Sequence, residues 1–302
     1  MAKVVIIGNS AAGFSACQAL AASAVSPEIT VVSNESYPAY NRNALTDFFL
    51  GNIKEKELFL CQEGFYRDKG ITFAAGAGVS RLDTKKQRLV LKNNDKVTYD
   101  YLIIASGSRP ALPDVPGKGK DGVLSFYCLE DIRRIKERLM ISQVACVIAG
   151  RPLCAKLAQA IASKGKEVKV ISRQPFDCAQ DQSIELIAGV QVKEFIGEGE
   201  LQAVKLDNGK IIGASLAVFA GDNAPATDFL RETEIATSAG YVVVDDAMRT
   251  NLENVFACGS VCVRQAQGPC DKGWDQACAE GTLVAQNILT LIEKGRATCQ
   301  SC

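Results

Sequence analysis

A glycine-bearing turn near the N-terminus is the first feature of the chain that could do chemistry. The hexapeptide that starts at Gly8 and ends at Gly13 follows the dinucleotide fingerprint G-x-G-x-x-G, with Ser10 at the middle glycine. A bound dinucleotide needs a tight turn at Gly8, a small residue at Ser10 where the backbone meets the pyrophosphate, and no side chain at Gly13. The backbone N–H groups at the start of the following helix, at Ala11 and Ala12, then face the phosphates.

The elements around this turn form a strand–helix–strand unit. An apolar strand at residues 3–8 precedes the turn, an alanine-rich helix runs to about residue 24, and a second strand covers residues 29–32. Glu35 stands just beyond the second strand, 22 residues after Gly13, and is placed to accept hydrogen bonds from a ribose. The alternative is a glycine turn in some other α/β protein, because a single fingerprint has low specificity.

The chain contains 12 cysteines and no histidine. Without histidine there is no Ser-His-Asp triad, no His-assisted thiol and no His-ligated metal. The chemistry must therefore come from a cofactor, cysteines, carboxylates, or the side chains of lysine and arginine.

Half of these cysteines lie near the C-terminus. Four of them fall within 21 residues, with spacings that match no ferredoxin pattern: Cys258, Cys262, Cys270 and Cys278. We interpret Cys258 and Cys278 as small buried apolar residues, and three others on apolar faces as core residues: Cys17, Cys146 and Cys154. We predict no metal site; the candidates for one are Cys299 and Cys302, whose CxxC spacing makes a compact chelate or redox pair.

Composition and charge narrow the class of protein. The 302 residues suffice for two domains, and 47% hydrophobic with 23% charged residues is typical of a globular protein. Lys+Arg and Asp+Glu both total 34, so we expect no nucleic-acid partner and no anionic membrane partner. No secretory signal and no apolar run of about 20 residues is visible, so we expect a cytoplasmic protein.

A second strand–helix–strand pattern follows a linker rich in proline and glycine at residues 110–122. It comprises a strand at 143–149, a helix at 152–164 and a strand at 167–172. The remaining expected elements are a hairpin near 89–91, a buried strand at 97–105, further strands at 190–195, 201–206, 215–219, 241–244 and 255–257, and a final helix at 275–293.

Five segments together resemble one family, the FAD-dependent pyridine nucleotide-disulfide oxidoreductases, in the branch of rubredoxin reductase, NADH oxidase and nitrite reductase. They are VVIIGNSAAG at the start, YPAYNRNALTDFFLG at 37–51, YDYLIIASGSRP at 99–110, YVVVDDAMRTNLENVFACGS at 241–260 and GWDQACAEGTLVAQNIL at 273–289. The resemblance implies an α/β fold with two Rossmann-like dinucleotide-binding domains, the NAD(P)-type domain inserted into the FAD domain. The expected domains are residues 1–110 and 242–302 for FAD and 111–241 for NAD(P). The sequence ends after the last FAD helix, so the resemblance implies that the family's C-terminal dimerisation domain is missing.

The resemblance also implies an FAD site. Its expected residues are Gly8, Ser10, Ala11, Ala12 and Gly13 at the pyrophosphate, Glu35 at the adenosine ribose, Val79 at the adenine, and Ala105, Ser106, Gly107 and Arg109 closing over the cofactor. Arg42 matches a basic residue beside the flavin ring, where a cation would stabilise negative charge and act in catalysis; the alternative is a solvated loop arginine. The family's late Gly-Asp, which holds the flavin's ribityl chain, is Gly259-Ser260 here.

The second fingerprint departs further from the family. Its three glycines are replaced by Ala149, Arg151 and Cys154, and Arg151 would fill the space of a pyrophosphate unless its guanidinium substitutes as a ligand. Lys156 stands where the family often has a glutamate near the nicotinamide. Arg173, at the end of the second strand, suits the 2′-phosphate of NADPH.

The resemblance leaves two functions open. The first is an FAD-dependent oxidoreductase that passes electrons between a donor, NAD(P)H included, and a small redox protein or disulfide. The second is an FAD-containing electron-transfer or structural subunit of a larger redox complex that does not use nicotinamide. The redox cysteine of disulfide-reducing members is missing near Ala44, and the middle domain has no CxxC. The acceptor, the partner and the oligomeric state are not determined by the sequence.

Overall fold

The computed structural model describes residues 1–302 except 151–152, 176–181, 266–267, 269–271 and 301–302. The chain forms two compact units: unit 1 contains residues 1–41, 59–108 and 225–302, and unit 2 contains residues 42–58 and 109–224. These limits differ from the expected ones, because 42–58 pack with unit 2 and 225–241 pack with unit 1. Among the described residues no helix is both long and apolar enough to cross a membrane.

Unit 1 is built on a parallel sheet with the strand order β20-β7-β1-β2-β3. The strands are β1 (Lys3–Ile7), β2 (Glu28–Val32), β3 (Thr72–Ala74), β7 (Tyr101–Ile104) and β20 (Val255–Ala257). The apolar run that begins at Val4 is completely buried in the central strand, as is usual for a parallel strand covered on both faces. The first predicted strand–helix–strand unit is confirmed, with α1 (Ala11–Ala21) between β1 and β2.

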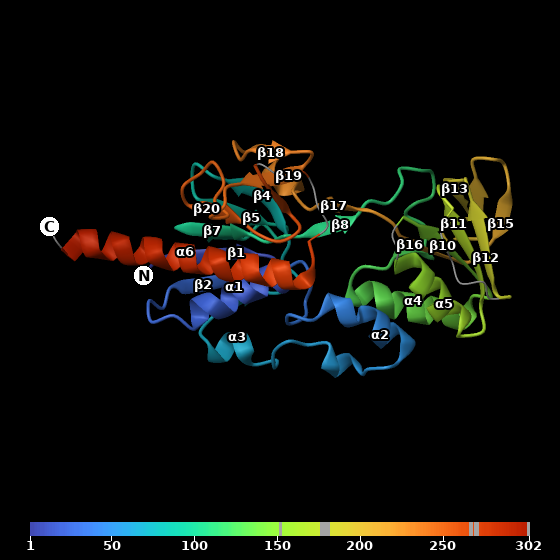
Figure 1. Ribbon diagram of the computed structural model, residues 1–302, viewed down its shortest axis with the longest axis horizontal. Coiled ribbons are helices and arrows are strands. Elements are labelled where there is room, and N and C mark those ends of the chain that lie inside the picture. Colours follow the sequence, from blue (N-terminus) through green and yellow to red (C-terminus); the bar gives the residue numbers. More distant parts are fainter. Residues whose placement is uncertain (151–152, 176–181, 266–267, 269–271, 301–302) are drawn as a thin grey trace. The chain divides into compact units, whose positions relative to one another are not determined.

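Helix α1 packs against α6 (Trp274–Gln300), and the two run side by side in Figure 1. Small residues make this close approach possible, since a Cβ atom on Gly281 would overlap the carbonyl oxygen of Ala12. Helix α6 continues beyond the predicted end at residue 293. The sequence after residue 293 reads KGRATCQ and has no apolar period by which to follow the helix.

Two small sheets complete unit 1. The first is antiparallel and contains β4 (Val79–Asp83), β5 (Arg88–Leu91) and β6 (Lys96–Thr98); the second contains β18 (Thr237–Ser238), β19 (Tyr241–Val244) and β21 (Cys262–Arg264). The single strand predicted at 97–105 is wrong, because it is divided between β6 and β7. The chain changes sheets at Tyr99 and Asp100, whose N–H groups donate to Gln87 and Lys3.

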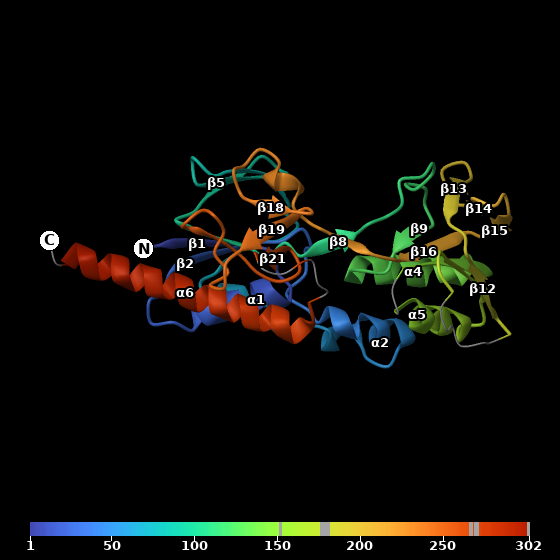
Figure 2. The same cartoon turned by 45° about the horizontal axis from the view of Figure 1, so that its top comes forward.

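Unit 2 contains the second parallel sheet, in the order β12-β11-β10-β16-β9. Its strands are β9 (Val123–Ser125), β10 (Val144–Ala149), β11 (Glu167–Ser172), β12 (Ile184–Ala188) and β16 (Leu216–Ala220). Helices α4 (Leu129–Ile141) and α5 (Leu153–Ala162) lie along one face of this sheet (Figure 2). The opposite face packs on an antiparallel sheet of β13 (Val192–Ile196), β14 (Ala203–Leu206) and β15 (Ile211–Gly213).

Residues 42–58 belong to unit 2 because two side chains of α4 bond to them. They form η1 (Arg42–Ala44), α2 (Leu45–Leu50) and η2 (Glu55–Glu57). Arg133 donates to both carboxylate oxygens of Glu55, at 2.5 and 3.3 Å. The ammonium of Lys136 donates to the carbonyl of Phe48 at 2.8 Å and lies 3.6 Å from the centre of its ring.

Candidate functional site

The fingerprint turn of unit 1 is a closely packed backbone junction. Gly8 directly follows β1 and has φ +107°, a left-handed conformation that favours glycine. A Cβ atom on Gly8 would overlap the carbonyl oxygen of Ala105, and one on Gly13 would overlap the carbonyl oxygen of Gly8. The start of α1 therefore lies directly against the carboxyl ends of β1 and β7, which is where a parallel sheet binds ligands.

The N-terminus of α1 is suited to an anion. Ser10 is the N-cap residue, and in the described part of the chain no side chain caps the helix. The first turn carries no acidic residue, and its side chains at Ala11 and Ala12 are small and buried. The free N–H groups and the positive end of the helix dipole then remain available to a phosphate.

Asn9, whose identity the fingerprint does not specify, adds a side-chain donor to this turn. Its Oδ1 accepts a 2.8 Å hydrogen bond from the hydroxyl of Tyr66. Its Nδ2 is buried and has no hydrogen-bond partner among the described residues. Leaving such a donor unsatisfied costs about 1–3 kcal/mol, so the turn fits a ligand that brings an acceptor, such as a phosphate oxygen. The sequence signal that could have identified Asn9 is its polar side chain between two positions of the fingerprint.

Glu35 follows β2, and its carboxylate is oriented by a neighbour. The hydroxyl of Tyr40 donates to Oε2 of Glu35 at 2.6 Å. The N–H of Gly76 donates to the carbonyl of Glu35 at 3.1 Å, which ties the segment leading to Val79 to the end of β2. Val79 is half-buried at the start of β4. The predicted ribose residue is thus bonded to Gly76, three residues before the predicted adenine residue Val79, within unit 1.

The segment after β7 brings Ala105, Ser106 and Gly107 to the same sheet end. The hydroxyl of Ser106 donates to the carbonyl of Ala226 at 2.8 Å, and the N–H of Ala226 donates to the carbonyl of Gly107 at 3.0 Å. These bonds fix the backbone that the resemblance places over the cofactor. The two predicted arginines, Arg42 and Arg109, belong to unit 2, so their flavin contacts stay predictions.

The Gly259-Ser260 turn follows β20 and approaches the same helix start. A Cβ atom on Gly259, which has φ +78°, would lie 3.1 Å from Cβ of Ala12. The N–H of Gly259 donates to Oε2 of Glu280 at 2.8 Å, and the Glu280 side chain pairs with Lys272 at 2.9 Å. Glu280 and Lys272 were not predicted from the sequence, because nothing in their spacing connects them with the turn.

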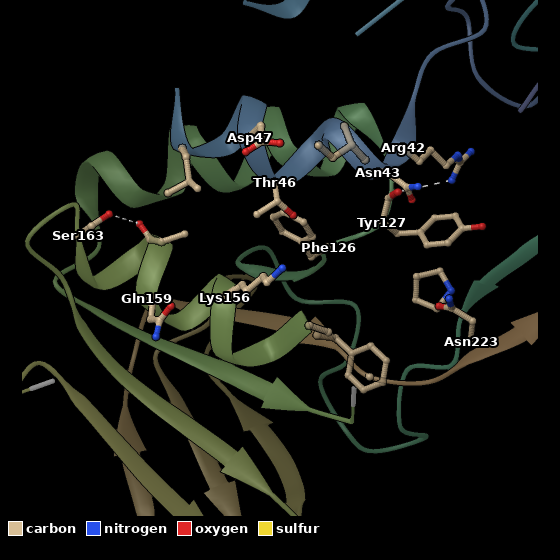
Figure 3. Close-up of a pocket in the computed structure, with 17 residues that line it drawn as sticks. Arg42, Asn43, Thr46, Asp47, Phe126, Tyr127, Lys156, Gln159, Ser163 and Asn223 are labelled. Carbon is tan, nitrogen blue, oxygen red and sulfur yellow. Dashed lines mark hydrogen bonds between the residues drawn. The ribbon is translucent and has the colours of Figure 1, made fainter. Parts of the chain in front are cut away.

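A cavity of about 700 Å³ lies in unit 2 between α2 and α5. Figure 3 shows Thr46 on one wall and Lys156 on the opposite wall, with Phe126 between them. Arg42 lines the same cavity, with its guanidinium carbon 4.6 Å from the centre of the Tyr127 ring. The cavity thus combines aromatic walls with two cations: Arg42, which the resemblance places beside the flavin ring, and Lys156, which stands where the family often has a glutamate near the nicotinamide.

A second cavity of about 670 Å³ opens at the carboxyl ends of β10, β11 and β16. Its charged residues, among those described, are Arg173 after β11 and Asp222 after β16. Arg151, predicted to obstruct or replace the pyrophosphate contacts, lies outside the described residues. Cys154, in the last fingerprint position, is completely buried, and its thiol donates to the carbonyl of Ala220 at 3.0 Å.

The described cysteines are mostly buried thiols. Cys17, Cys146 and Cys154 are core residues, as predicted, and burial raises the pKa of Cys17 and of Cys146 to about 12. Cys258 is also buried, as predicted, whereas the prediction for Cys278 is wrong, because this residue of α6 is only half-buried. In the described residues no three Cys, His, Asp or Glu side chains converge on a metal position. Cys270 and Cys302 lie outside the described residues, and of Cys299 only the backbone is described.

Comparisons with known proteins agree with this arrangement. A family model described as pyridine nucleotide-disulphide oxidoreductase matches residues 2–281. The NADH-rubredoxin oxidoreductase of Clostridium acetobutylicum is 29% identical over 273 residues, covering 88% of this chain and 70% of that protein. The ferredoxin–NAD(+) reductase subunit of the benzene 1,2-dioxygenase system of Pseudomonas putida is 28% identical over 273 residues, covering 85% of this chain and 66% of that protein.

The fold is shared with solved structures at low sequence identity. The water-forming NADH oxidase from Lactobacillus brevis superposes with a TM-score of 0.85 at 21% identity, covering 95% of this chain and 69% of that one. The chain contains two parallel sheets, each with a strand–helix–strand unit, and the family model matches nearly its whole length. The chain belongs to the pyridine nucleotide-disulphide oxidoreductase family.

Proposed function

We propose that the chain is an FAD-dependent oxidoreductase that passes electrons between a nicotinamide donor and a small redox protein or a disulfide. The observation that carries the proposal is the anion-binding junction of unit 1. Three features meet there at one sheet end: the start of α1, the close-packed Gly8 and Gly13, and the Asn9 amide nitrogen, which has no partner among the described residues. When bound, FAD supplies hydride and single-electron transfer.

Unit 1 is then the FAD domain, and different residues of it would bind different parts of the cofactor. The N–H groups of α1 and the Asn9 amide would bind the pyrophosphate, and the Glu35 carboxylate would accept hydrogen bonds from the ribose. Ser260 would donate to the ribityl chain in place of an aspartate, with a weaker bond because its hydroxyl is neutral. On the family resemblance, two residues of unit 2 would add to this site: Arg42 as a cation beside the flavin ring and Arg109 closing over the cofactor.

Unit 2 is then the nicotinamide-type domain, and its second cavity is the proposed nucleotide site. Arg173 lies at the end of β11, the position from which dinucleotide-binding domains contact the adenosine ribose. A carboxylate there accepts from a 2′-hydroxyl, whereas a guanidinium attracts a 2′-phosphate, so we assign NADPH as the preferred donor. The names of the relatives, with NADH or NAD(+) and a rubredoxin or ferredoxin, support a nicotinamide donor and a small redox protein as partner.

A second candidate is an FAD-containing subunit of a larger redox complex that does not use nicotinamide. Cys154 favours it, because this buried thiol fills the place where a glycine would let α5 pack against the sheet beside a pyrophosphate.

The visible spectrum of the purified protein tests both candidates. Oxidised flavin bands are expected in the protein as isolated or after addition of FAD, and a protein that remains colourless would contradict either function. Anaerobic NADPH, NADH and dithionite are then added in separate cuvettes. Bleaching by NADPH supports the oxidoreductase, whereas bleaching by dithionite alone supports the subunit.

A further inference from the structure

Unit 1 buries an ion pair in which Lys272 Nζ lies 2.9 Å from Glu280 Oε2. The two side chains are only 4% and 5% exposed. Removing two charges from water costs several kcal/mol per ion, and an apolar pair of similar volume is often as stable. Stability alone is therefore a poor explanation for these two residues.

The ion pair makes hydrogen bonds to the turn formed by residues 259–262, here called the ribityl turn. Oε2 of Glu280 also accepts the N–H of Gly259 at 2.8 Å, while Oε1 accepts from the Gln276 amide at 3.3 Å. At the other end of the turn, Nζ of Lys272 lies 3.4 Å from Sγ of Cys262. The network therefore holds both the first and the last residue of the turn that carries Ser260.

The position of the ribityl turn matters because it borders the fingerprint helix. Gly259 approaches Ala12 so closely that a Cβ atom would lie 3.1 Å from the alanine Cβ, and Ser260 is half-buried beside it. A serine hydroxyl makes a weaker hydrogen bond than a carboxylate and has a shorter reach, so its usefulness depends on where the backbone holds it.

We propose that Glu280 and Lys272 are positioning residues, which hold Gly259 and Ser260 in place for the ribityl chain of FAD. The proposal rests on the proposed function, because it presupposes that unit 1 binds FAD. Glu280 acts as the acceptor for the Gly259 N–H, and Lys272 neutralises the carboxylate that this acceptor requires. A network that served only to stabilise the fold would affect FAD affinity only as far as it affected stability.

Two double variants separate these roles while keeping the charge balanced. Lys272→Met/Glu280→Gln removes both charges but keeps an acceptor for Gly259. Lys272→Met/Glu280→Leu removes the acceptor as well. Glu293→Gln, at an exposed position of the same helix, is the control. The Kd for FAD is measured on the apoprotein by quenching of flavin fluorescence, and the Tm of each apoprotein is measured in the same buffer.

We expect the Gln double variant to bind FAD within about threefold of wild type and the Leu double variant to bind at least about tenfold more weakly, at matched Tm. Equal FAD affinity of the two double variants would overturn the proposal. This holds if both keep the wild-type affinity, and equally if both lose affinity together with a fall in Tm. A wild-type chain that takes up no FAD would instead overturn the proposed function itself. The FAD titration of the wild-type apoprotein therefore distinguishes failure of the proposed function from failure of the positioning role.

Discussion

The hydroxyl of Tyr66 donates a 2.8 Å hydrogen bond to Oδ1 of Asn9, and this bond orients the asparagine amide within the fingerprint turn. Tyr66 is itself buried, and its ring stacks on Phe73 with 4.3 Å between the ring centres. The Tyr66 oxygen also accepts a hydrogen bond from the N–H of Ala39 at 3.3 Å, so its own proton is left to donate to Oδ1, which favours this orientation of the amide. Nδ2 is therefore presented in a fixed direction, without a partner in the described residues.

Removal of this donor should weaken FAD binding. We expect Asn9→Leu to raise the Kd for FAD about tenfold, because one hydrogen bond to a charged phosphate is lost. Tyr66→Phe should raise it less, since the amide remains but is free to rotate. Titration of the apoproteins with FAD measures both effects. Tyr101→Phe in the same unit should leave the Kd unchanged, and an Asn9→Leu variant with wild-type affinity would remove Asn9 from the site.

Gly13→Val should abolish FAD retention. Its Cβ would overlap the Gly8 carbonyl, so α1 would have to move away from the sheet end that binds the pyrophosphate. The expected result is a colourless protein after gel filtration, with flavin content measured by absorbance after denaturation. Gly295→Ala, where the added Cβ meets nothing within 4 Å, should keep wild-type flavin content. Normal flavin content in Gly13→Val would refute the fingerprint interpretation.

Arg42→Ala should keep the flavin and alter its reduction. Arg42 lies in unit 2 with its guanidinium over the Tyr127 ring, so it makes no part of the unit 1 junction that retains the dinucleotide. Loss of a cation near the ring should lower the midpoint potential of the flavin, because negative charge on the reduced form is less stabilised. Equilibration with redox dyes measures the potential. A midpoint potential equal to that of wild type would mean that Arg42 has only a structural role in unit 2.

Arg173→Glu should abolish the preference for NADPH over NADH. Wild type is expected to be reduced faster by NADPH than by NADH, with a preference that falls as salt is added because a guanidinium–phosphate contact is screened. The variant should lose the NADPH preference, since a carboxylate repels a 2′-phosphate. Stopped-flow flavin reduction with both nucleotides measures these rates. Rapid and saturable reduction of wild type by NADH at micromolar concentration would contradict the assignment.

The buried thiols should make the protein less stable in alkali. Burial raises the pKa of Cys146 from 9.0 to about 12, so in this range the folded state keeps a proton that the unfolded state releases. The free energy of unfolding therefore falls as the pH rises from about 9 toward 12, by about 1.4 kcal/mol per unit of pKa difference at most. Urea unfolding measured at about pH 8, 9 and 10 follows this decline in the free energy of unfolding.

The matched variant for this prediction is Cys146→Ala. A small cavity lowers its stability at every pH, but its decline with pH should be shallower than that of wild type because one raised thiol pKa is gone. Equal slopes for the two proteins would show that Cys146 does not contribute.

Local sequence determined the parts of this protein that depend on neighbours along the chain. The apolar run before Gly8, the turn to Gly13 and the second strand ahead of Glu35 specify one strand–helix–strand unit, because periodicity and glycine positions act within a few residues. The second such unit, from β10 through α5 to β11, is specified in the same way. The FAD-site expectations at 8–13 follow from this local pattern.

Tertiary structure decided which distant segments meet. Residues 42–58 pack with unit 2 because Arg133 and Lys136, far along the chain, reach Glu55 and Phe48. Glu280 reaches the N–H of Gly259, and Tyr66 orients Asn9, across separations of 21 and 57 residues. These contacts are set by the way helices and loops pack on a sheet, and no periodicity within the chain encodes them, so only the three-dimensional arrangement reveals the residues that position the site.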